Sequence, residues 1–185
     1  MTQLLGISGS LRAGSFNTAL LRAAQQLAGD DVQIEITTLQ GIPLYDADLE
    51  AASGIPEAVQ ALKARVIASD GVLLATPEYN SGMPGVVKNA IDWLSRPPAD
   101  IGKVFGGRPL ALLGASPSGF GTVLAQTAWL PTLKHLGVNL WSGGRVLVSR
   151  ANTLMDANGS LADEATRKNL AEFVRGFAAF AAKAP

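Results

Sequence analysis

The sequence predicts a three-layer α/β fold, in which a parallel sheet of five strands is covered by helices on both faces. Two observations carry this prediction. Short apolar runs that end in glycine or serine are typical of buried strands, and longer segments carry apolar residues at helical spacing. The two kinds of segment alternate along the chain, as they do in a doubly wound sheet. The length of 185 residues, without repeats or a linker-like change of composition, predicts one domain over residues 1–185.

Five segments are expected to form the strands. Three of them are continuous apolar runs, which favours strands covered on both faces. In the second segment Val32, Ile34 and Ile36 alternate with polar residues, which places that strand nearer an edge of the sheet. The last strand is expected to be broken at Gly143-Gly144. In chain order the strands are expected at 4–8, 32–39, 71–76 and 109–115, and as the two pieces 138–141 and 145–149.

Amphipathic helices are expected between and after these strands. The helix that begins at Ser53 has Pro56 in its first turn, a position that suits proline. The next helix stops at Pro97-Pro98, and the fourth is kinked by Pro131 and ends at Gly137. The apolar stripes run over 16–28, 59–66, 86–94, 122–136 and 170–180.

The last helix is expected to follow a turn at Asn158-Gly159. Ser160 and Asp163 have the spacing of a capping box, in which two side chains satisfy the free backbone N–H groups of a helix start. The sequence therefore predicts a helix that begins at this pair.

Composition excludes several classes of protein. The 15 basic residues balance 15 acidic ones, so the chain lacks the basic excess that binds nucleic acids or anionic membranes. There is no cysteine and the one histidine is His135, which excludes a disulfide framework, a thiol nucleophile and an ordinary zinc site. No apolar stretch approaches the ~20 residues of a membrane span, and the N-terminus does not resemble a signal peptide. We therefore expect a cytoplasmic protein.

Ligands of a doubly wound sheet bind at the carboxyl ends of the strands, where the strand order reverses, so function is expected in the loops after the first, third and fourth strands. The first of these loops, 8–17, is rich in glycine and serine and leads into a helix. No acidic residue precedes Asp30, and Arg12 and Arg22 are the charged side chains of the first 29 residues. A helix start beside an arginine suits an anion such as a phosphate.

The type of phosphate is narrowed by what this loop lacks. It has no G-x-G-x-x-G dinucleotide fingerprint. Gly9 and Gly14 have the spacing of a P-loop, but Ser15-Phe16 stands in place of the lysine and hydroxyl residue that nucleotide hydrolysis needs. A terminal monophosphate remains. The alternative is a polar turn in which a serine merely caps the helix.

The loop after the third strand, 76–85, contains two prolines and two glycines that favour a rigid, extended path. Tyr79 offers an aromatic surface, and Asn80 offers a hydrogen-bond donor and acceptor. This combination suits a flat heterocycle with a hydrogen-bonding edge. The alternative is a proline- and glycine-rich turn with a half-exposed tyrosine.

The loop after the fourth strand, 116–121, nearly matches the nucleophile elbow G-x-S-x-G around Ser116, but its fifth position is Ser118. A serine hydrolase would need His135 as its base, and that residue lies within a helix instead of a late loop. The hydrolase interpretation is therefore disfavoured.

Four segments together resemble the NADPH-dependent FMN reductase family, which includes bacterial quinone, chromate and azo-dye reductases of flavodoxin-like fold. The segments are Gly9–Asn17, Ile42–Asp48, Thr76–Asn80 and Lys88–Arg96. The resemblance extends over essentially the whole chain, and the combination is specific although each segment alone is weak. The last segment suits helix packing, and the family suggests a subunit interface nearby.

The resemblance implies FMN as cofactor and assigns three groups of residues to it. The first group would hold the phosphate, the second would line the isoalloxazine and ribityl region chiefly through the backbone, and the third would close the far side of the ring. The groups are Ser10, Arg12, Ser15, Phe16 and Asn17; Pro77, Glu78, Tyr79 and Asn80; and Ser116, Ser118 and Gly119. Pro117 interrupts the small-residue turn of the family in the third group.

The resemblance further implies an oxidoreductase that uses NADPH or NADH and reduces a small-molecule acceptor, such as a quinone or an azo dye, by a ping-pong mechanism. Because the flavin carries the chemistry, no catalytic side chain and no metal ligand is assigned. A homodimer or homotetramer is expected. Two alternatives stay open: an FMN electron carrier of flavodoxin type, which commonly has a strongly charged surface, and a module without flavin.

Overall fold

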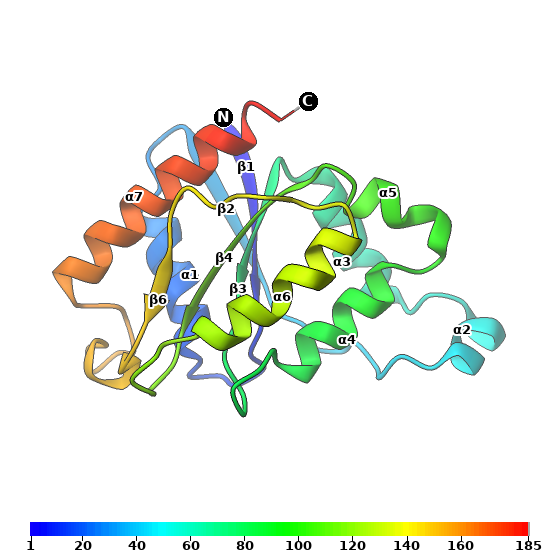
Figure 1. Ribbon diagram of the computed structural model, residues 1–185, viewed down its shortest axis with the longest axis horizontal. Helices are drawn as coiled ribbons and strands as arrows, with labels where there is room; N and C mark the ends of the chain where they lie inside the picture. Colours follow the sequence, from blue (N-terminus) through cyan, green and yellow to red (C-terminus); the bar gives the residue numbers. More distant parts are fainter. Residues whose placement is uncertain (185) are drawn as a thin grey trace.

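A parallel β-sheet forms the middle layer of the computed structural model, which describes residues 1–184 (Figure 1). The strand order is β2-β1-β3-β4-β5, with β6 paired to β4 as well. Every pairing between these strands is parallel. The strands are β1 (Thr2–Ser8), β2 (Val32–Thr37), β3 (Gly71–Ala75), β4 (Pro109–Ala115), β5 (Asn139–Leu140) and β6 (Val146–Val148).

The sheet has five strand positions, because β5 and β6 share the last one. β5 pairs with Pro109 and Leu110 at the start of β4, and β6 pairs with 113–115 at its end. The predicted last strand, broken around Gly143-Gly144, is thus confirmed. The predicted edge position of the second strand is also confirmed, since β2 pairs with β1 alone among the described strands. The strand order reverses between β1 and β3, as in a flavodoxin-like doubly wound sheet.

Two helical layers cover the sheet (Figure 1). On one face α1 and α7 pack against the strands, and on the other face α3, α4 and α6 do so. None of the helices in residues 1–184 is both long enough and apolar enough to cross a membrane. The helices are α1 (Phe16–Leu27), α2 (Ala47–Ser53), α3 (Glu57–Ala68), α4 (Gly85–Leu94), α5 (Ile101–Val104), α6 (Val123–His135) and α7 (Glu164–Ala181), with short 3-10 helices η1 (Pro98–Asp100) and η2 (Ala151–Thr153).

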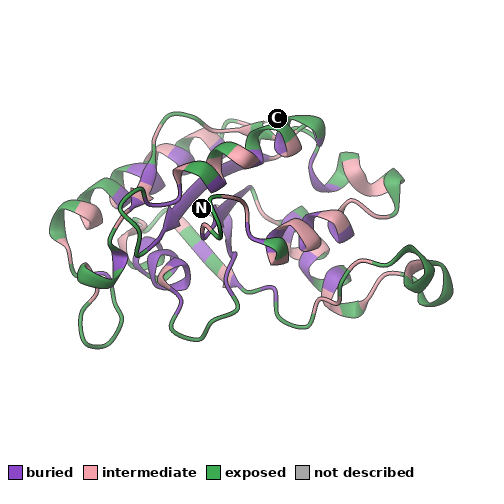
Figure 2. Ribbon diagram, turned by 60° about the horizontal axis from the view of Figure 1, so that its bottom comes forward, coloured by how far each residue is buried: buried purple, intermediate pink, exposed green. Residues whose placement is uncertain are grey.

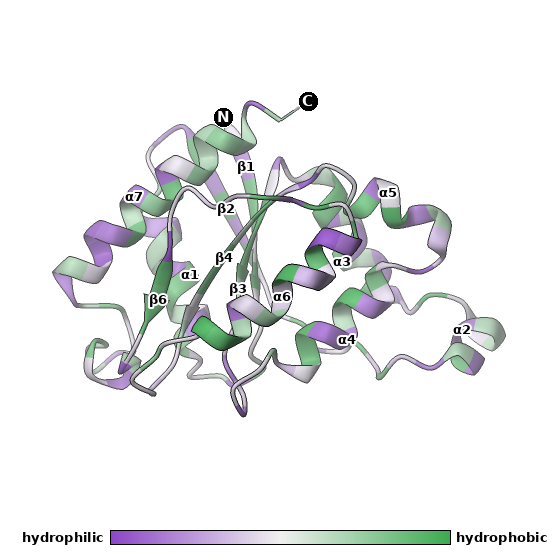
Figure 3. Ribbon diagram, viewed as in Figure 1, coloured by the Kyte–Doolittle hydropathy of each residue, from purple (hydrophilic) through white to green (hydrophobic). Residues whose placement is uncertain are grey.

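Alternate residues of the strands enter two separate hydrophobic cores. Leu4 and Leu73 lie in the core under α1 and α7, whereas their neighbours Leu5 and Leu74 lie in the core under α3, α4 and α6. The strands are therefore buried and apolar along most of their length, whereas the helices present polar, exposed residues on their outer sides (Figures 2 and 3). This two-sided burial explains why β1, β3 and β4 have continuous apolar sequences.

The helix expected from Ser53 begins later than predicted. Ser53 is the last residue of α2, a short helix that the sequence did not predict, and Pro56 is the N-cap of α3 and not part of its first turn. The side chain of Asp46 caps α2, and Gly54 ends it with a φ of 75°. Because no residue of α2 is buried, the segment has no apolar periodicity that could have predicted it. The short helices η1 and α5 after Pro97 were likewise not predicted.

The capping box predicted at Ser160 and Asp163 is wrong. Asp163 is itself the N-cap of α7, and its carboxylate accepts hydrogen bonds from the backbone N and the Oγ1 of Thr166 at 2.8 and 2.7 Å. Ser160 instead donates its backbone N–H to Asp156 within the preceding turn. That turn is confirmed by Gly159, whose φ is +74°. Aspartate is itself a favoured N-cap residue, so the start of α7 is capped without a contribution from Ser160.

Two of the family-like segments pack against each other. The side chain of Asn89 in α4 accepts a hydrogen bond from Tyr45 N at 2.8 Å and donates one to Pro43 O at 2.8 Å. Arg96 Nε donates to Glu50 at 2.9 Å, and this hydrogen bond lowers the pKa of the Glu50 carboxyl. Segment 88–96 therefore holds the loop between β2 and α2 in place, which agrees with its interpretation as helix packing.

Candidate active site

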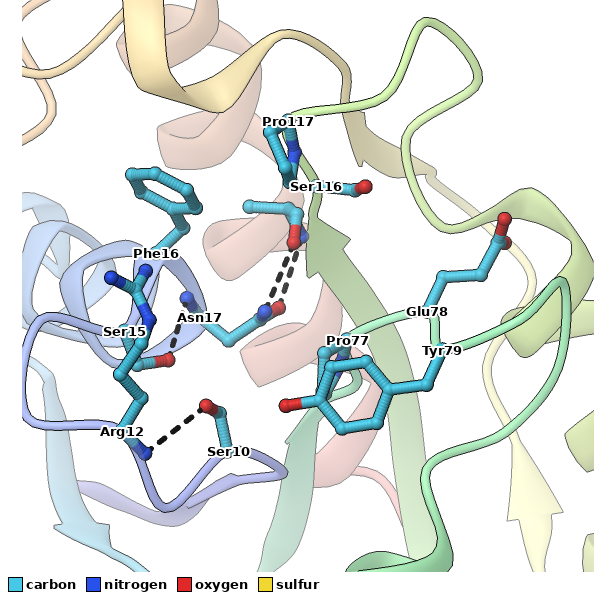
Figure 4. A pocket seen from close by; sticks show the side chains of 11 residues that line it. Ser10, Arg12, Ser15, Phe16, Asn17, Pro77, Glu78, Tyr79, Ser116 and Pro117 are labelled. Carbon is cyan, nitrogen blue, oxygen red and sulfur yellow. Dashed lines mark hydrogen bonds between the residues drawn. The ribbon is translucent and has the colours of Figure 1, made fainter.

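The carboxyl ends of β1, β3 and β4 open into one cavity of about 410 Å³ (Figure 4). It lies where the strand order reverses between β1 and β3, and the three loops predicted to carry function line it. The lining residues are Ser10, Arg12, Ser15, Phe16, Asn17, Pro77, Glu78, Tyr79, Ala115, Ser116 and Pro117. Most of the predicted site residues are thus brought together around one space.

Three predicted residues do not line this cavity, and two residues that were not predicted do. Asn80, Ser118 and Gly119 are exposed and lie outside the lining. Ala115 and Pro117 belong to it. Ala115 ends an apolar strand and has no polar side chain that could mark it as a site residue, and Pro117 interrupts the small-residue turn of the family. The contacts that the resemblance assigns to all twelve residues stay predictions.

Gly9 allows the first two loops to touch. Its backbone N–H donates to Ala75 O at 2.8 Å. A Cβ at this position would lie 2.7 Å from both Pro77 Cδ and Val87 Cγ2, closer than side-chain carbons come in proteins. The glycine therefore allows the loop after β1 to lie directly against the loop after β3.

Ser15 caps α1 and lies in the wall of the cavity. Its Oγ accepts hydrogen bonds from the backbone N of Asn17 and Thr18 at 3.2 and 3.3 Å, so its own proton is left to donate. Arg12 is exposed, with its guanidinium 4.9 Å from the centre of the Phe16 ring. The first turn of α1 contains no acidic residue. This end of the cavity therefore presents positive charge and donors to an anion.

Asn17 makes two hydrogen bonds that the sequence did not predict. Its side chain is buried, and it donates to Ala115 O and accepts from Ala115 N, both at 3.0 Å. This pair of bonds joins the start of α1 to the end of β4 (Figure 4). The Asn17 amide thus fixes the loop after β1, which carries the candidate phosphate-binding residues, relative to the loop after β4.

The loop after β3 contains a tight turn with an unusual backbone. Tyr79 and Gly82 exchange two backbone hydrogen bonds, of 3.2 and 3.0 Å, across Asn80 and Ser81. Asn80 has a φ of 51° and Ser81 a φ of 60°, the left-handed pair of a type I′ turn. Tyr79 is 49% exposed at the mouth of the cavity, and buried Pro77 forms the wall behind it. The turn therefore presents a rigid aromatic surface.

Glu78 lies in the same loop, but its carboxylate is turned toward α6. Oε2 accepts hydrogen bonds from the backbone N of Leu124 and of Ala125, at 2.9 and 3.0 Å. In Figure 4 the side chains of Glu78 and Tyr79 leave the loop in different directions. The carboxylate of Glu78 is therefore hydrogen-bonded to the start of α6.

The loop after β4 is held by hydrogen bonds within the loop and by one to strand β6. Ser116 Oγ donates to Ser118 Oγ at 3.0 Å and accepts from Ser118 N at 3.1 Å. The backbone N of Ser116 also donates to Val148 O, at the end of β6, at 2.9 Å. His135 is the last residue of α6 and does not line the cavity, so Ser116 has no histidine partner there. This geometry agrees with the rejection of a serine hydrolase.

The donor set fits a phosphate at one end and a flat ring at the other. The hydroxyls of Ser10 and Ser15 and the guanidinium of Arg12 gather at the first end, beside the start of α1. Pro77, Tyr79 and Pro117 provide apolar walls at the second. A doubly wound sheet with such a site at its switch point defines a flavin mononucleotide-binding protein of flavodoxin-like fold.

The chain belongs to the NADPH-dependent FMN reductase family, whose model matches residues 2–153. An NAD(P)H-dependent FMN reductase of Pseudomonas aeruginosa is 46% identical over 90% of this chain and 88% of its own length. A 2-hydroxy-1,4-benzoquinone reductase of a Burkholderia species is 38% identical over 94% of this chain and 93% of its own. The solved structure of FerB, a flavoenzyme NAD(P)H:acceptor oxidoreductase of Paracoccus denitrificans, superposes with a TM-score of 0.87 at 36% identity, covering 100% and 99% of the two chains.

These findings confirm the predicted family, the flavodoxin-like fold and the enzyme class, an NAD(P)H-dependent oxidoreductase that uses FMN. They leave the roles of individual site residues as predictions.

Proposed function

We propose that this enzyme oxidises NADPH or NADH and reduces a quinone or a similar small acceptor at the cavity between the loops after β1, β3 and β4. The observation that carries the proposal is the division of that one cavity into an anion-binding end and an aromatic mouth. The likeness over nearly the whole chain to a benzoquinone reductase supports a quinone as acceptor.

In this proposal each part of the cavity has a separate task. Arg12, Ser10 and Ser15 would hold the phosphate of FMN, and Tyr79 with Pro77 would flank its ring. Bound FMN supplies the redox chemistry, since its ring can take up a hydride from a nicotinamide and pass two electrons to an acceptor. The chain itself binds the cofactor, orients it and excludes water from it. Glu78, the acidic side chain of the lining, is engaged by α6, so we assign no proton transfer to it.

The flavin bound by the purified protein is expected to be FMN, in a ratio of about one per chain. The loop 8–17 at the anion-binding end of the cavity is compact and lacks a dinucleotide fingerprint, so it suits a terminal monophosphate. Denaturing the yellow protein and separating the released flavin by chromatography identifies it. Stoichiometric FAD, or a protein that stays colourless after incubation with FMN, would contradict the proposal.

Steady-state rates are expected to follow a ping-pong pattern. If the nicotinamide and the acceptor use the same mouth of the cavity in turn, plots of reciprocal rate against reciprocal quinone concentration at several NADPH concentrations are parallel. A control with the quinone omitted measures the rate with oxygen as acceptor. Intersecting lines, together with a complex that holds both substrates, would reject a shared position. Absence of turnover with any quinone or azo dye would favour an electron carrier instead.

Two further predictions complete the proposal. The protein is expected to act in the cytoplasm as a homodimer or homotetramer. Exposed apolar side chains near the mouth of the cavity, Tyr79, Phe120 and Leu124, support an assembly that covers this region. Light scattering of the purified protein measures its mass in solution.

A further inference from the structure

Helix α6 begins without a cap from its own sequence. Its N-cap residue, Thr122, makes no side-chain hydrogen bond to the helix start. Thr122 is fully buried, and its Oγ1 instead accepts from Gln126 Nε2 at 3.1 Å. The free backbone N–H groups of Leu124 and Ala125 are taken by Glu78, which lies 46 and 47 residues earlier in the chain. The cap of α6 is therefore supplied by the loop after β3.

Side-chain hydrogen bonds connect the loop after β3 to α6 at two places. At the base of the loop Thr76 Oγ1 accepts from Trp129 Nε1 at 3.1 Å, and farther along Glu78 binds the start of the helix. In the part of the chain that the structure describes, its two bonds to α6 are the only hydrogen bonds made by a side chain of residues 78–84. The turn from Tyr79 to Gly82 is otherwise closed on itself by its own backbone. Without Glu78, the turn would be connected to α6 only by packing and by the Trp129–Thr76 hydrogen bond at the base of the loop.

The two segments joined by Glu78 form opposite walls of the cavity. Pro77 and Tyr79 lie on one side, and Ser116 and Pro117, in the loop that leads into α6, lie on the other. We infer that Glu78 is a positioning residue, which acts through its carboxylate on the start of α6 to set the distance between the two walls that enclose the flavin ring. This inference rests on the proposed function, because the ring is the ligand whose fit it explains.

The experiment compares Glu78→Ala and Glu78→Gln with a matched control, Asp163→Ala. Asp163 caps α7 through two hydrogen bonds, as Glu78 caps α6, but it does not line the cavity. Both alanine variants lose a helix cap and are expected to lower the melting temperature of the flavin-free protein by a similar amount, about 2–4 °C. FMN is then titrated into each flavin-free protein, with flavin fluorescence as the signal.

Glu78→Ala is expected to raise the dissociation constant for FMN by about 3- to 10-fold, because the two walls are no longer held at their spacing. Glu78→Gln keeps one oxygen acceptor and is expected to recover part of this loss. Asp163→Ala is expected to bind FMN as the wild type does. A wild-type dissociation constant in Glu78→Ala, or an equal rise in Asp163→Ala, would overturn the inference.

Amide hydrogen exchange in the flavin-free proteins separates this inference from the proposed function. Glu78→Ala should exchange faster not only at Leu124 and Ala125, which lose their acceptor, but also at Tyr79 and Gly82 across the joint. Unchanged exchange at Tyr79 and Gly82 would show that the two walls are not coupled and would overturn the inference, even in a protein that binds FMN. A wild type that binds no FMN would overturn the proposed function and the positioning role with it.

Discussion

Replacing Arg12 by alanine is expected to weaken FMN binding by about 10- to 100-fold. A charge-assisted hydrogen bond to a phosphate contributes roughly 1.5–3 kcal/mol, and each 1.4 kcal/mol corresponds to about a factor of ten in the dissociation constant. Arg12 is the one cation among the residues that line the cavity, and it is held there by the ring of Phe16 at 4.9 Å. Titration of FMN into the flavin-free variant measures the loss.

Arg22→Ala is the matched control for this experiment. Arg22 is exposed on α1, carries the same charge and does not line the cavity. If the effect came from overall charge, both variants would lose affinity to a similar extent. At saturating FMN the turnover of Arg12→Ala should approach that of the wild type, because Arg12 holds the cofactor and takes no part in the redox step. Equal dissociation constants for Arg12→Ala and the wild type would remove Arg12 from the site and leave the loop as a capped turn.

The sequence predicted the strands of the sheet well, because a strand that is buried on both faces has apolar residues at consecutive positions. The run 71–76 is apolar at consecutive positions, since Val72 and Leu74 enter one core and Leu73 enters the other. Elements without buried residues have no such apolar pattern from which they could be predicted. Helix α2 has none, and its cap at Asp46 had no apolar stripe beside it to mark a helix. The contact between segment 42–48 and Asn89 in α4 could not be predicted either, because it joins residues far apart in the sequence.

The location of the site could be predicted from topology, but the function of its side chains could not. Parallel strands end at one edge, so the loops after β1, β3 and β4 had to meet. Which way a side chain turns depends on partners far along the chain. Asn17 is bound to Ala115, 98 residues away, and Glu78 to α6. Asn80 has a left-handed backbone and lies outside the lining, and neither detail can be read from a proline- and glycine-rich segment.

Replacing Gly114 by alanine is expected to destabilise the fold more than any other single methyl group added near the site. Gly114 lies in β4 beneath the start of α6. A Cβ there would lie 2.1 Å from Thr122 Oγ1 and 2.4 Å from Thr76 O. Neither neighbour can move freely, because Thr122 is fully buried and Thr76 O belongs to the backbone at the end of β3. Overpacking of this kind costs roughly 1–3 kcal/mol or more, so we expect a loss of about 3 kcal/mol in the free energy of unfolding.

Denaturant unfolding of the flavin-free protein measures this loss without the stabilising effect of a ligand. Gly102→Ala is the control, since a Cβ at that exposed position meets no atom within 4 Å, and it is expected to leave the midpoint unchanged or slightly raised. Adding Thr122→Ala to Gly114→Ala removes the 2.1 Å contact but keeps the 2.4 Å contact with Thr76 O, so the double variant should recover only part of the stability. A Gly114→Ala protein as stable as the wild type would contradict this prediction, because it would show that both Thr122 and the end of β3 can move to make room for the added methyl group.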